Sequence, residues 1–183
     1  LHAMLTRLGT DIIDMGVVRD EPQAVRSALL EAAAAADAVI TSGGVSVGEA
    51  DYIKEILTEL GTVHFWKVAM KPGRPLAFGS IDGSVFFGLP GNPVSVMVTF
   101  YQFVQPALLQ IMGAEQQPRL LVKARATNTL KKRPGRVEYQ RGFLSSDEAG
   151  ELIVGTDADQ GSGVLSSMSK ANCFVVLPID GGR

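Results

Sequence analysis

The sequence predicts an α/β protein in which a three-layer α/β/α domain is followed by a small antiparallel β-barrel domain. Two patterns carry this prediction. Helical and strand-like segments alternate through the first 112 residues, which is typical of a largely parallel sheet layered by helices. After a polar linker at 113–118, strand-like segments separated by turns follow. We therefore expect domains at residues 1–115 and 119–183.

The first helix is expected over Leu1–Leu8, where apolar residues recur at a helical spacing and Gly9 is suited to end the helix. A strand is expected over Thr10–Val18. Pro22, a residue favoured in the first helical turn, then precedes an alanine-rich, helix-forming segment that runs to Ala36.

Short β-branched runs and turn signals place the other elements. Ala38–Thr41 is typical of a strand buried on both faces, and Asp82-Gly83 is a dipeptide favoured in hairpins. Asn92 and Pro93 are suited to the start of a long apolar helix. The expected elements are strands over 38–41, 62–70, 76–80, 85–88, 119–129, 136–144, 151–156 and 173–179, and helices over 51–60 and 94–112.

Composition restricts the class of protein. The chain has 183 residues, of which 46% are hydrophobic and 20% charged, as in soluble globular proteins. No apolar run reaches the roughly 18 residues that span a bilayer, and no signal-peptide pattern is present, so we expect a cytoplasmic protein without a membrane partner. The lone cysteine, Cys173, lies in a strand-like run and is expected to be a buried, inert thiol.

The charges are unevenly distributed although the net charge is only −2. Residues 11–60 hold ten acidic side chains, whereas residues 119–141 hold eight basic ones against the single acid Glu138. The basic run is interpreted either as a solvated face or as an anion-binding surface. Nucleic-acid binding is disfavoured because the run lacks aromatic side chains for base stacking.

A strand, a glycine-rich turn and a helix follow one another at 38–57, which places the turn at the carboxyl end of a strand, where open α/β sheets bind ligands. The turn residues expected to bind a ligand are Ser42, Gly43, Gly44, Ser46 and Gly48. Two carboxylates, Glu49 and Asp51, also belong to this turn, and Asp20 precedes another helix. Oxygen ligands without a Cys/His set favour Mg²⁺. The alternative is that Asp51 and Asp20 are helix caps and Glu49 a surface residue.

Two further turns are candidate anion sites. Lys67, Lys71 and Arg74 lie on or beside a rigid turn that contains two prolines, although they are also interpretable as surface cations. A second strand-turn-helix motif contains Pro90, Gly91, Asn92 and Pro93. Ser162, in the sequence Gln-Gly-Ser-Gly, offers a hydroxyl group within either an oxyanion contact or a plain turn.

Three motifs resemble the molybdopterin molybdenumtransferases, the MoeA family, which is also similar to the gephyrin E domain. They are Thr-Ser-Gly-Gly-Val-Ser-Val-Gly-Glu-Ala-Asp at 41–51, Phe-Trp-Lys-Val-Ala-Met-Lys-Pro-Gly-Arg-Pro at 65–75 and Gly-Leu-Pro-Gly-Asn-Pro-Val-Ser at 88–95. The resemblance continues through Pro134-Gly135-Arg136 and Gln140-Arg141-Gly142. It implies a molybdopterin-binding α/β/α domain without its first strand, and a C-terminal β-barrel domain without its last.

The resemblance also implies the chemistry. In this family molybdate is inserted into adenylylated molybdopterin, with hydrolysis of the pyrophosphate, release of AMP and assistance from Mg²⁺. By motif, Asp20, Glu49 and Asp51 would hold metal or phosphate. The residues that would line the anion pocket are Lys67, Lys71, Arg74, Arg141 and Ser162, with the turn from Pro90 to Pro93 shaping it. Catalysis would fall to Asp20, Asp51, Lys67 and Lys71.

Relatives carry a strand and further domains before residue 1, so we expect a fragment of a longer, homodimeric protein, incompletely active alone. The molybdopterin adenylyltransferase and other cofactor-synthesis proteins are expected partners. Two alternatives stay open: a pterin-binding or dimeric scaffold module without catalysis, and the adenylyltransferase itself. The second domain and the Lys-Pro-Gly-Arg-Pro turn disfavour the adenylyltransferase.

Overall fold

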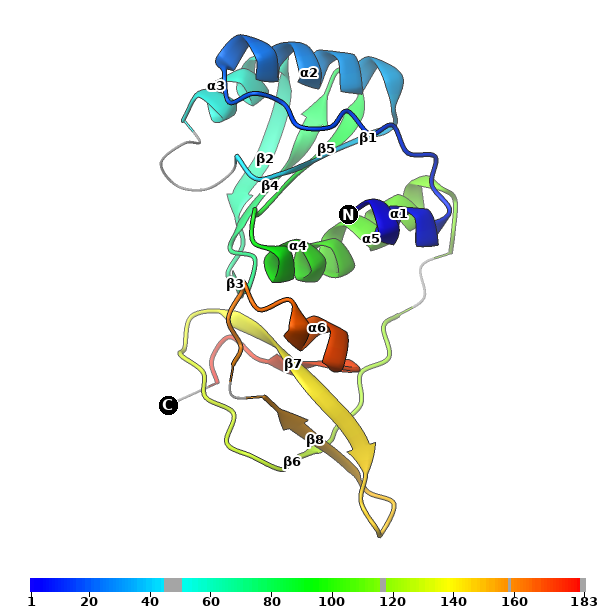
Figure 1. Ribbon diagram of the computed structural model, residues 1–183, viewed down its shortest axis with the longest axis vertical. Helices are drawn as coiled ribbons and strands as arrows, with labels where there is room; N and C mark the ends of the chain where they lie inside the picture. The colour runs from blue at the N-terminus through cyan, green and yellow to red at the C-terminus, as the bar shows by residue number, and fades with distance from the viewer. Residues whose placement is uncertain (45–50, 116–117, 158, 182–183) are drawn as a thin grey trace.

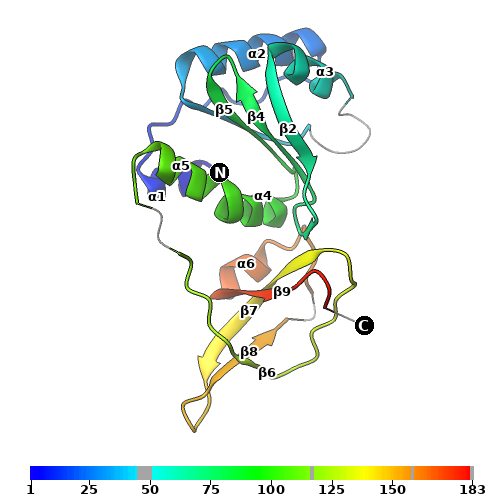
Figure 2. The same cartoon turned by 180° about the vertical axis from the view of Figure 1, so that it is seen from behind.

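The computed structural model describes residues 1–44, 51–115, 118–157 and 159–181. The molecule is elongated, with a layered α/β part at one end and a β-rich part at the other, as Figures 1 and 2 show from opposite sides. Ser46, Gly48 and Glu49 lie outside the described residues. The expected α/β class is confirmed by the elements that follow.

The first sheet contains four strands in the order β1-β5-β4-β2. These are β1 (Ala38–Ser42), β2 (Gly61–Lys67), β4 (Pro75–Ile81) and β5 (Ser84–Leu89). β1 pairs with β5 in parallel, but β4 is antiparallel to both β5 and β2. The expectation of a largely parallel sheet is therefore wrong for the described strands. The tight turn at Asp82 (φ 46°) and Gly83 (φ 90°) explains the direction of β4 relative to β5, because a two-residue hairpin forces antiparallel pairing.

Helices cover both faces of this sheet, as a three-layer domain requires. They are α1 (His2–Leu8), α2 (Pro22–Ala35), α3 (Asp51–Leu60), and a continuous helix made of α4 (Pro93–Thr99), the π-helical segment η1 (Phe100–Val104) and α5 (Gln105–Ile111). Leu29 of α2 and Leu57 of α3 share a core with Phe86 on one face. On the other face, Val96 and Phe100 pack on Phe87, with α1 alongside.

The helix from Pro93 to Ile111 is the one described helix that is long and apolar enough to cross a membrane, with 19 residues and a mean hydropathy of 1.3. Val94, Val98 and Val104 on this helix are fully buried within the protein. Its apolar character is therefore explained by its position in the core between the sheet and the β-rich part.

The expected strand at 10–18 is wrong. These residues have no regular structure, and four of their apolar side chains are exposed, reaching 60% at Ile13 and 100% at Val17. Among the described residues, no strand pairs with this segment. An extended segment without a neighbouring strand has no ladder of hydrogen bonds to hold it, which explains the difference.

The second sheet holds five strands: β3 (Met70–Lys71), β6 (Arg125–Ala126), β7 (Val137–Ser146), β8 (Leu152–Thr156) and β9 (Cys173–Leu177). Their order is β3-β7-β8-β6, with β9 also on β7. Over the described residues the sheet is open and does not close into the expected barrel. The strand expected at 62–70 ends earlier, at Lys67. Met70, the last residue of the expected strand, belongs instead to β3 in the second sheet. A short helix, α6 (Ser166–Lys170), was not predicted because five residues are too few for a periodic pattern.

Candidate functional site

The turn after β1 is bonded to the turn after β5. The Gly43 N–H donates to the Leu89 carbonyl at 3.0 Å, and the Ser42 hydroxyl donates to the Pro90 carbonyl at 3.3 Å. Parallel neighbours end at the same edge of a sheet, so two turns that lie apart in the sequence meet there. Gly43 (φ 89°) adopts a left-handed conformation, as expected. Its N–H, however, is committed to the protein and is not free for a ligand.

Asn92 contacts the β-rich part directly. It occupies the backbone cap position of α4, but its side chain makes no cap hydrogen bond. Its amide donates instead to the Ser162 hydroxyl at 3.2 Å, and the Ser162 carbonyl accepts from the Val94 N–H at 3.2 Å. Pro93 has no N–H, and the N–H groups of Gly91 and Asn92 have no acceptor among the described residues. Two backbone N–H groups beside the positive end of this helix are thus without an acceptor in the part of the chain that the structure describes.

Arg141 holds the loop that carries Ser162. Its side chain is almost fully buried, and it donates to the Gly161 carbonyl at 3.1 Å and the Ser167 hydroxyl at 3.0 Å. The Gln160 side chain accepts from the Arg141 N–H at 2.9 Å and donates to the Arg141 carbonyl at 3.1 Å. Burial lowers the pKa of the Arg141 guanidinium below its ordinary value, and the Asp159 carboxylate opposes this shift. Several of its donors are thus used to fix the 159–163 loop.

The cationic turn packs against the same helix. Met70 is buried with Val94 and Val98, and the Val68 N–H donates to the Arg74 carbonyl at 3.0 Å. Gly73 has φ 98°, and a Cβ added there would lie 2.5 Å from the Thr99 methyl group. The turn that carries Lys71 is therefore placed by α4, close to where the Ser162 loop contacts that helix.

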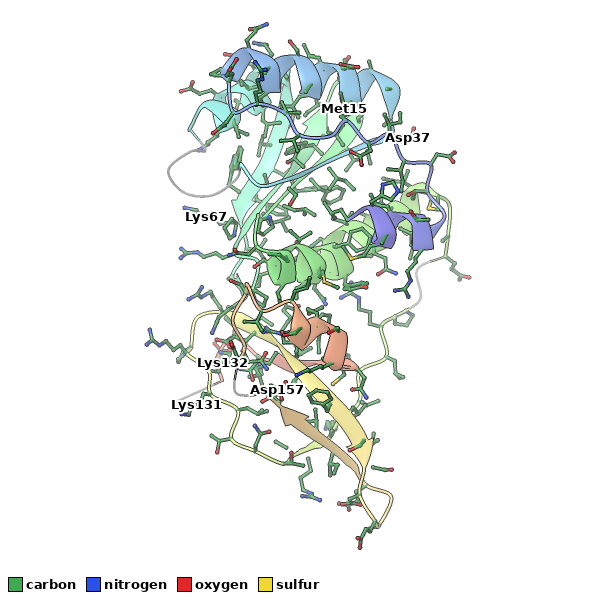
Figure 3. All side chains as sticks on the ribbon, viewed as in Figure 1. Met15, Asp37, Lys67, Lys131, Lys132 and Asp157 are labelled. Atoms are coloured by element: carbon green, nitrogen blue, oxygen red, sulfur yellow. The ribbon has the colours of Figure 1, made fainter. Side chains whose placement is uncertain are left out.

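The side chains of this turn reach solvent. Lys67, Lys71 and Arg74 are exposed, and Lys67 projects away from the end of β2 (Figure 3). Lys71 has an ion-pair partner, Glu138, at 3.5 Å. The two interpretations, surface cations or an anion site, stay open for Lys67 and Arg74.

Two of the acidic candidates lie at or just before the start of a helix. Asp51 is the first residue of α3, and Asp20 is exposed in a bend before α2, where Glu21 and not Asp20 takes the cap position. Within the part of the chain that the structure describes, no group of three or more His, Cys, Asp or Glu residues could hold a metal ion. The strand that would have carried Asp20 to the sheet edge is missing, so that expectation loses its basis.

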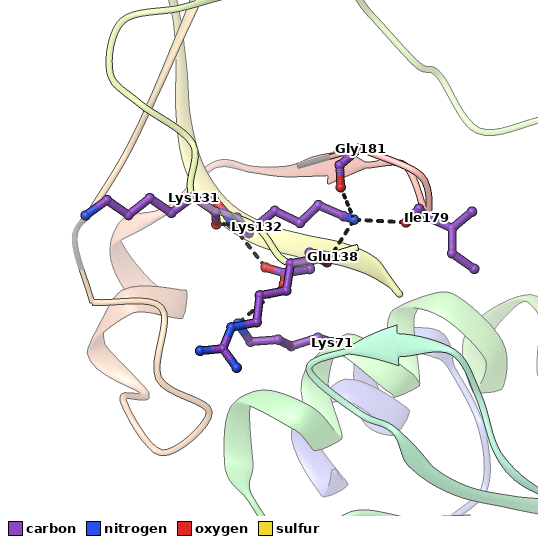
Figure 4. Close-up of polar contacts among 8 residues, drawn as sticks. Lys71, Lys131, Lys132, Glu138, Ile179 and Gly181 are labelled. Atoms are coloured by element: carbon purple, nitrogen blue, oxygen red, sulfur yellow. Dashed lines mark hydrogen bonds and ion pairs between the residues drawn. The ribbon is translucent and has the colours of Figure 1, made fainter. Parts of the chain in front are cut away.

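Sequence reasoning missed the buried residues of the basic run. Lys132 is 6% exposed, and its ammonium group donates to the carbonyls of Arg133, Ile179 and Gly181 at 3.1, 3.2 and 2.6 Å (Figure 4). Arg141 is also buried, so the run is not simply a solvated face. The sequence offered one signal that part of this run is buried, namely that Glu138 is the single acid among these cations.

Two cavities lie away from the turns described above. A cavity of about 550 Å³ is lined by Ala33–Asp37 and Gly83–Val85, at the amino ends of β1 and β5, opposite the edge where α/β sheets bind ligands. Another, of about 460 Å³, lies between the long helix and β9, with Arg141 and Cys173 in its wall. Burial raises the pKa of the Cys173 thiol, which supports the expectation that it is inert.

A three-layer α/β/α domain whose turns meet at one sheet edge, joined to a β-rich part that touches that edge, defines a class of two-part α/β protein. In open α/β sheets generally, ligands bind at the strand ends. The family described as "Probable molybdopterin binding domain" matches residues 1–110, and that described as "MoeA C-terminal region (domain IV)" matches residues 123–183. The chain belongs to the molybdopterin-binding domain family, with the C-terminal region of MoeA.

Individual proteins similar to this chain agree with the family matches. The molybdopterin molybdenumtransferase of Haemophilus influenzae is 46% identical over 181 residues, which cover 98% of this chain and 45% of that protein. Gephyrin of Dictyostelium discoideum is 35% identical, over an alignment that covers 90% of this chain and 26% of gephyrin. A crystal structure of the molybdopterin biosynthesis MoeA protein from Pyrococcus horikoshii superimposes with a TM-score of 0.75 at 30% identity, over 99% of this chain and 44% of that one. The chain thus spans less than half the length of these relatives.

Proposed function

We propose that these residues form the ligand-binding half of a molybdopterin molybdenumtransferase. The enzyme would insert molybdate into adenylylated molybdopterin, hydrolyse the pyrophosphate and release AMP. The observation that carries this proposal is the contact between Asn92 and Ser162, because it joins the helix N-terminus of one part to a loop of the other. The family relationship supports the substrate class.

The described residues suit an anionic ligand in two ways. The N–H groups of Gly91 and Asn92, which have no acceptor among the described residues, and the dipole of the long helix favour negative charge at the turn from Pro90 to Pro93. Lys71, on a turn that is packed against the same helix, supplies a cationic donor. Charged donors that are already positioned before the ligand binds stabilise the charge that develops on a pyrophosphate or oxyanion. The protein then does not have to reorganise these donors at each turnover. Lys67 and Arg74 would add long-range attraction.

We propose that Mg²⁺ is held by Glu49 and Asp51. Oxygen donors of this kind suit Mg²⁺, which would neutralise charge on the pyrophosphate oxygens when bound. We also propose a cytoplasmic homodimer that receives its substrate from the molybdopterin adenylyltransferase. Light scattering of the full-length protein would test the dimer.

The direct test is AMP release by the full-length protein from adenylylated molybdopterin, with and without molybdate. We expect release that depends on molybdate and stops when EDTA removes the metal. Lys71→Met should lower kcat/KM about 100-fold, because a charged donor to the reacting anion is lost. Lys170→Met, in the last turn of α6, is the matched control. Absence of AMP release by the wild-type protein would refute the proposed function.

A further inference from the structure

A buried carboxylate lies directly behind Lys71. Glu138 is 5% exposed, and the parallel pairing of β3 with β7 sets Lys71 opposite Glu138 in register. The Glu138 Oε1 atom lies 3.5 Å from Lys71 Nζ (Figure 4). Burying a carboxylate is unfavourable unless it is paired, so its place beside Lys71 requires an explanation.

The carboxylate is held in place from its other side. Gln140, itself 5% exposed, donates from Nε2 to Glu138 Oε2 at 3.2 Å and to the Lys131 carbonyl at 2.9 Å. A buried amide anchored to the main chain thus orients Glu138. The second oxygen is left to face Lys71.

The neighbouring buried cation does not compete for this oxygen. The ammonium group of Lys132 has three N–H donors, and three main-chain carbonyls accept from it. Glu138 and Lys71 are therefore paired with each other, although their environments differ. The Glu138 side chain is 6% exposed, whereas that of Lys71 is 51% exposed.

We propose that Glu138 is a positioning residue for Lys71, which rests on the proposed function of Lys71 in binding an anionic ligand. A half-exposed lysine samples many rotamers, and fixing it costs conformational entropy when a ligand binds. The carboxylate restricts that freedom beforehand. A single long contact to one oxygen leaves the other donors of the ammonium group for the ligand.

The arrangement predicts a particular kinetic signature. Glu138 orients Lys71 but also offsets its charge, so removing the carboxylate loosens the ammonium group while strengthening its attraction for anions. Misplacing a charged group at a reacting centre lowers kcat, whereas stronger ground-state attraction lowers KM. We therefore expect Glu138→Gln in the full-length protein to lower kcat about tenfold. The KM for molybdate should stay within about twofold of wild type or fall.

Three variants sharpen the test. Glu138→Asp keeps the charge and should recover part of the lost kcat. Glu148→Gln removes an exposed carboxylate from the turn between β7 and β8 and should leave both constants unchanged. In a Lys71→Met background, Glu138→Gln should change kcat by less than about twofold, because a residue that acts through Lys71 has no further effect once Lys71 is gone.

Other outcomes overturn the proposal. The proposal is refuted if Glu138→Gln keeps the wild-type kcat, or if Glu138→Asp recovers none of the lost kcat. A further tenfold loss of kcat when Glu138→Gln is added to Lys71→Met also refutes it. If Glu138→Gln does not fold, Lys71→Met/Glu138→Met replaces both partners and leaves no unpaired charge. It must then match Lys71→Met in kcat, and a lower value refutes the positioning role. A wild-type protein without AMP release refutes the proposed function instead.

Discussion

The side-chain amide of Asn92 donates to the hydroxyl of Ser162 across 3.2 Å, although 70 positions separate these residues in the chain. One precedes the long core helix, and the other lies in a loop of the β-rich part. The contact therefore depends on the relative placement of both parts, which Arg141 maintains by holding the loop. A site built this way is sensitive to changes far from the ligand.

The first prediction concerns Ser162. Ser162→Ala removes the hydroxyl that accepts from Asn92 and leaves the amide without that partner. We expect kcat/KM for AMP release to fall about tenfold, equivalent to about 1.4 kcal/mol. Steady-state kinetics of the full-length protein measures this. Ser169→Ala, which removes a hydroxyl on α6 that donates to the nearby Ser166 carbonyl, should have little effect, and an equal loss there would contradict the assignment.

The second prediction concerns Lys132. Lys132→Met removes an ammonium group that satisfies three main-chain carbonyls. Losing three charge-assisted hydrogen bonds made by a buried ammonium group destabilises the protein, so we expect the free energy of unfolding to fall by about 2 to 4 kcal/mol. Urea unfolding measures the loss. Lys131→Met, at the exposed neighbouring position, should change stability by less than about 0.5 kcal/mol. Similar values for the two variants would contradict the role given to these contacts.

Local signals predicted much of the α/β part. Gly9 ends α1 with φ 83°, Pro22 begins α2, and Asp82-Gly83 forms the expected hairpin turn. Each of these depends on the backbone preference of one or two residues. Pairing partners were harder to predict, because the direction of β4 and the lack of a partner for residues 10–18 depend on strands distant in the sequence.

In the candidate site, too, local features could be predicted from the sequence and long-range contacts could not. The turns that contain Ser42 and Asn92 could be recognised because each follows a strand and precedes a helix. The engagement of Asn92 with Ser162, and of Lys71 with Glu138, could not be predicted, since both contacts cross between the parts. Strand register and loop packing, and not residue type, decide such contacts.

The third prediction concerns Gly73. Gly73→Ala would place a methyl group 2.5 Å from the Thr99 side chain and force alanine into a left-handed conformation. We expect a loss of about 2 to 4 kcal/mol in unfolding free energy, together with reduced AMP release because the Lys71 turn shifts. Gly83→Ala is a matched control, because Gly83 has a similar φ of 90° but open space around it. It should cost only about 1 kcal/mol, and equal losses would mean that the Thr99 contact is unimportant.

The fourth prediction concerns acid stability and Asp147. Its carboxylate accepts from the N–H groups of Glu151 and Ala149, both at 3.0 Å, and from Arg125 at 2.8 Å. These contacts, the Glu151 N–H foremost, hold the pKa of Asp147 below its ordinary value of 3.8. A carboxyl group whose folded-state pKa is depressed adds stability above its unfolded pKa. That stability is lost as the pH falls through the folded-state pKa.

Replacing this carboxylate should therefore reduce the acid sensitivity of folding. Asp147→Asn cannot be protonated, so the contribution of the 147–151 turn no longer varies with pH. We expect its unfolding free energy to fall less steeply than that of wild type as the pH is lowered from about 4 to 2. Urea unfolding midpoints across that range measure the slope. Asp11→Asn, in the irregular segment before α2, should keep the wild-type slope. An unchanged slope in Asp147→Asn would show that these hydrogen bonds do not bias its protonation.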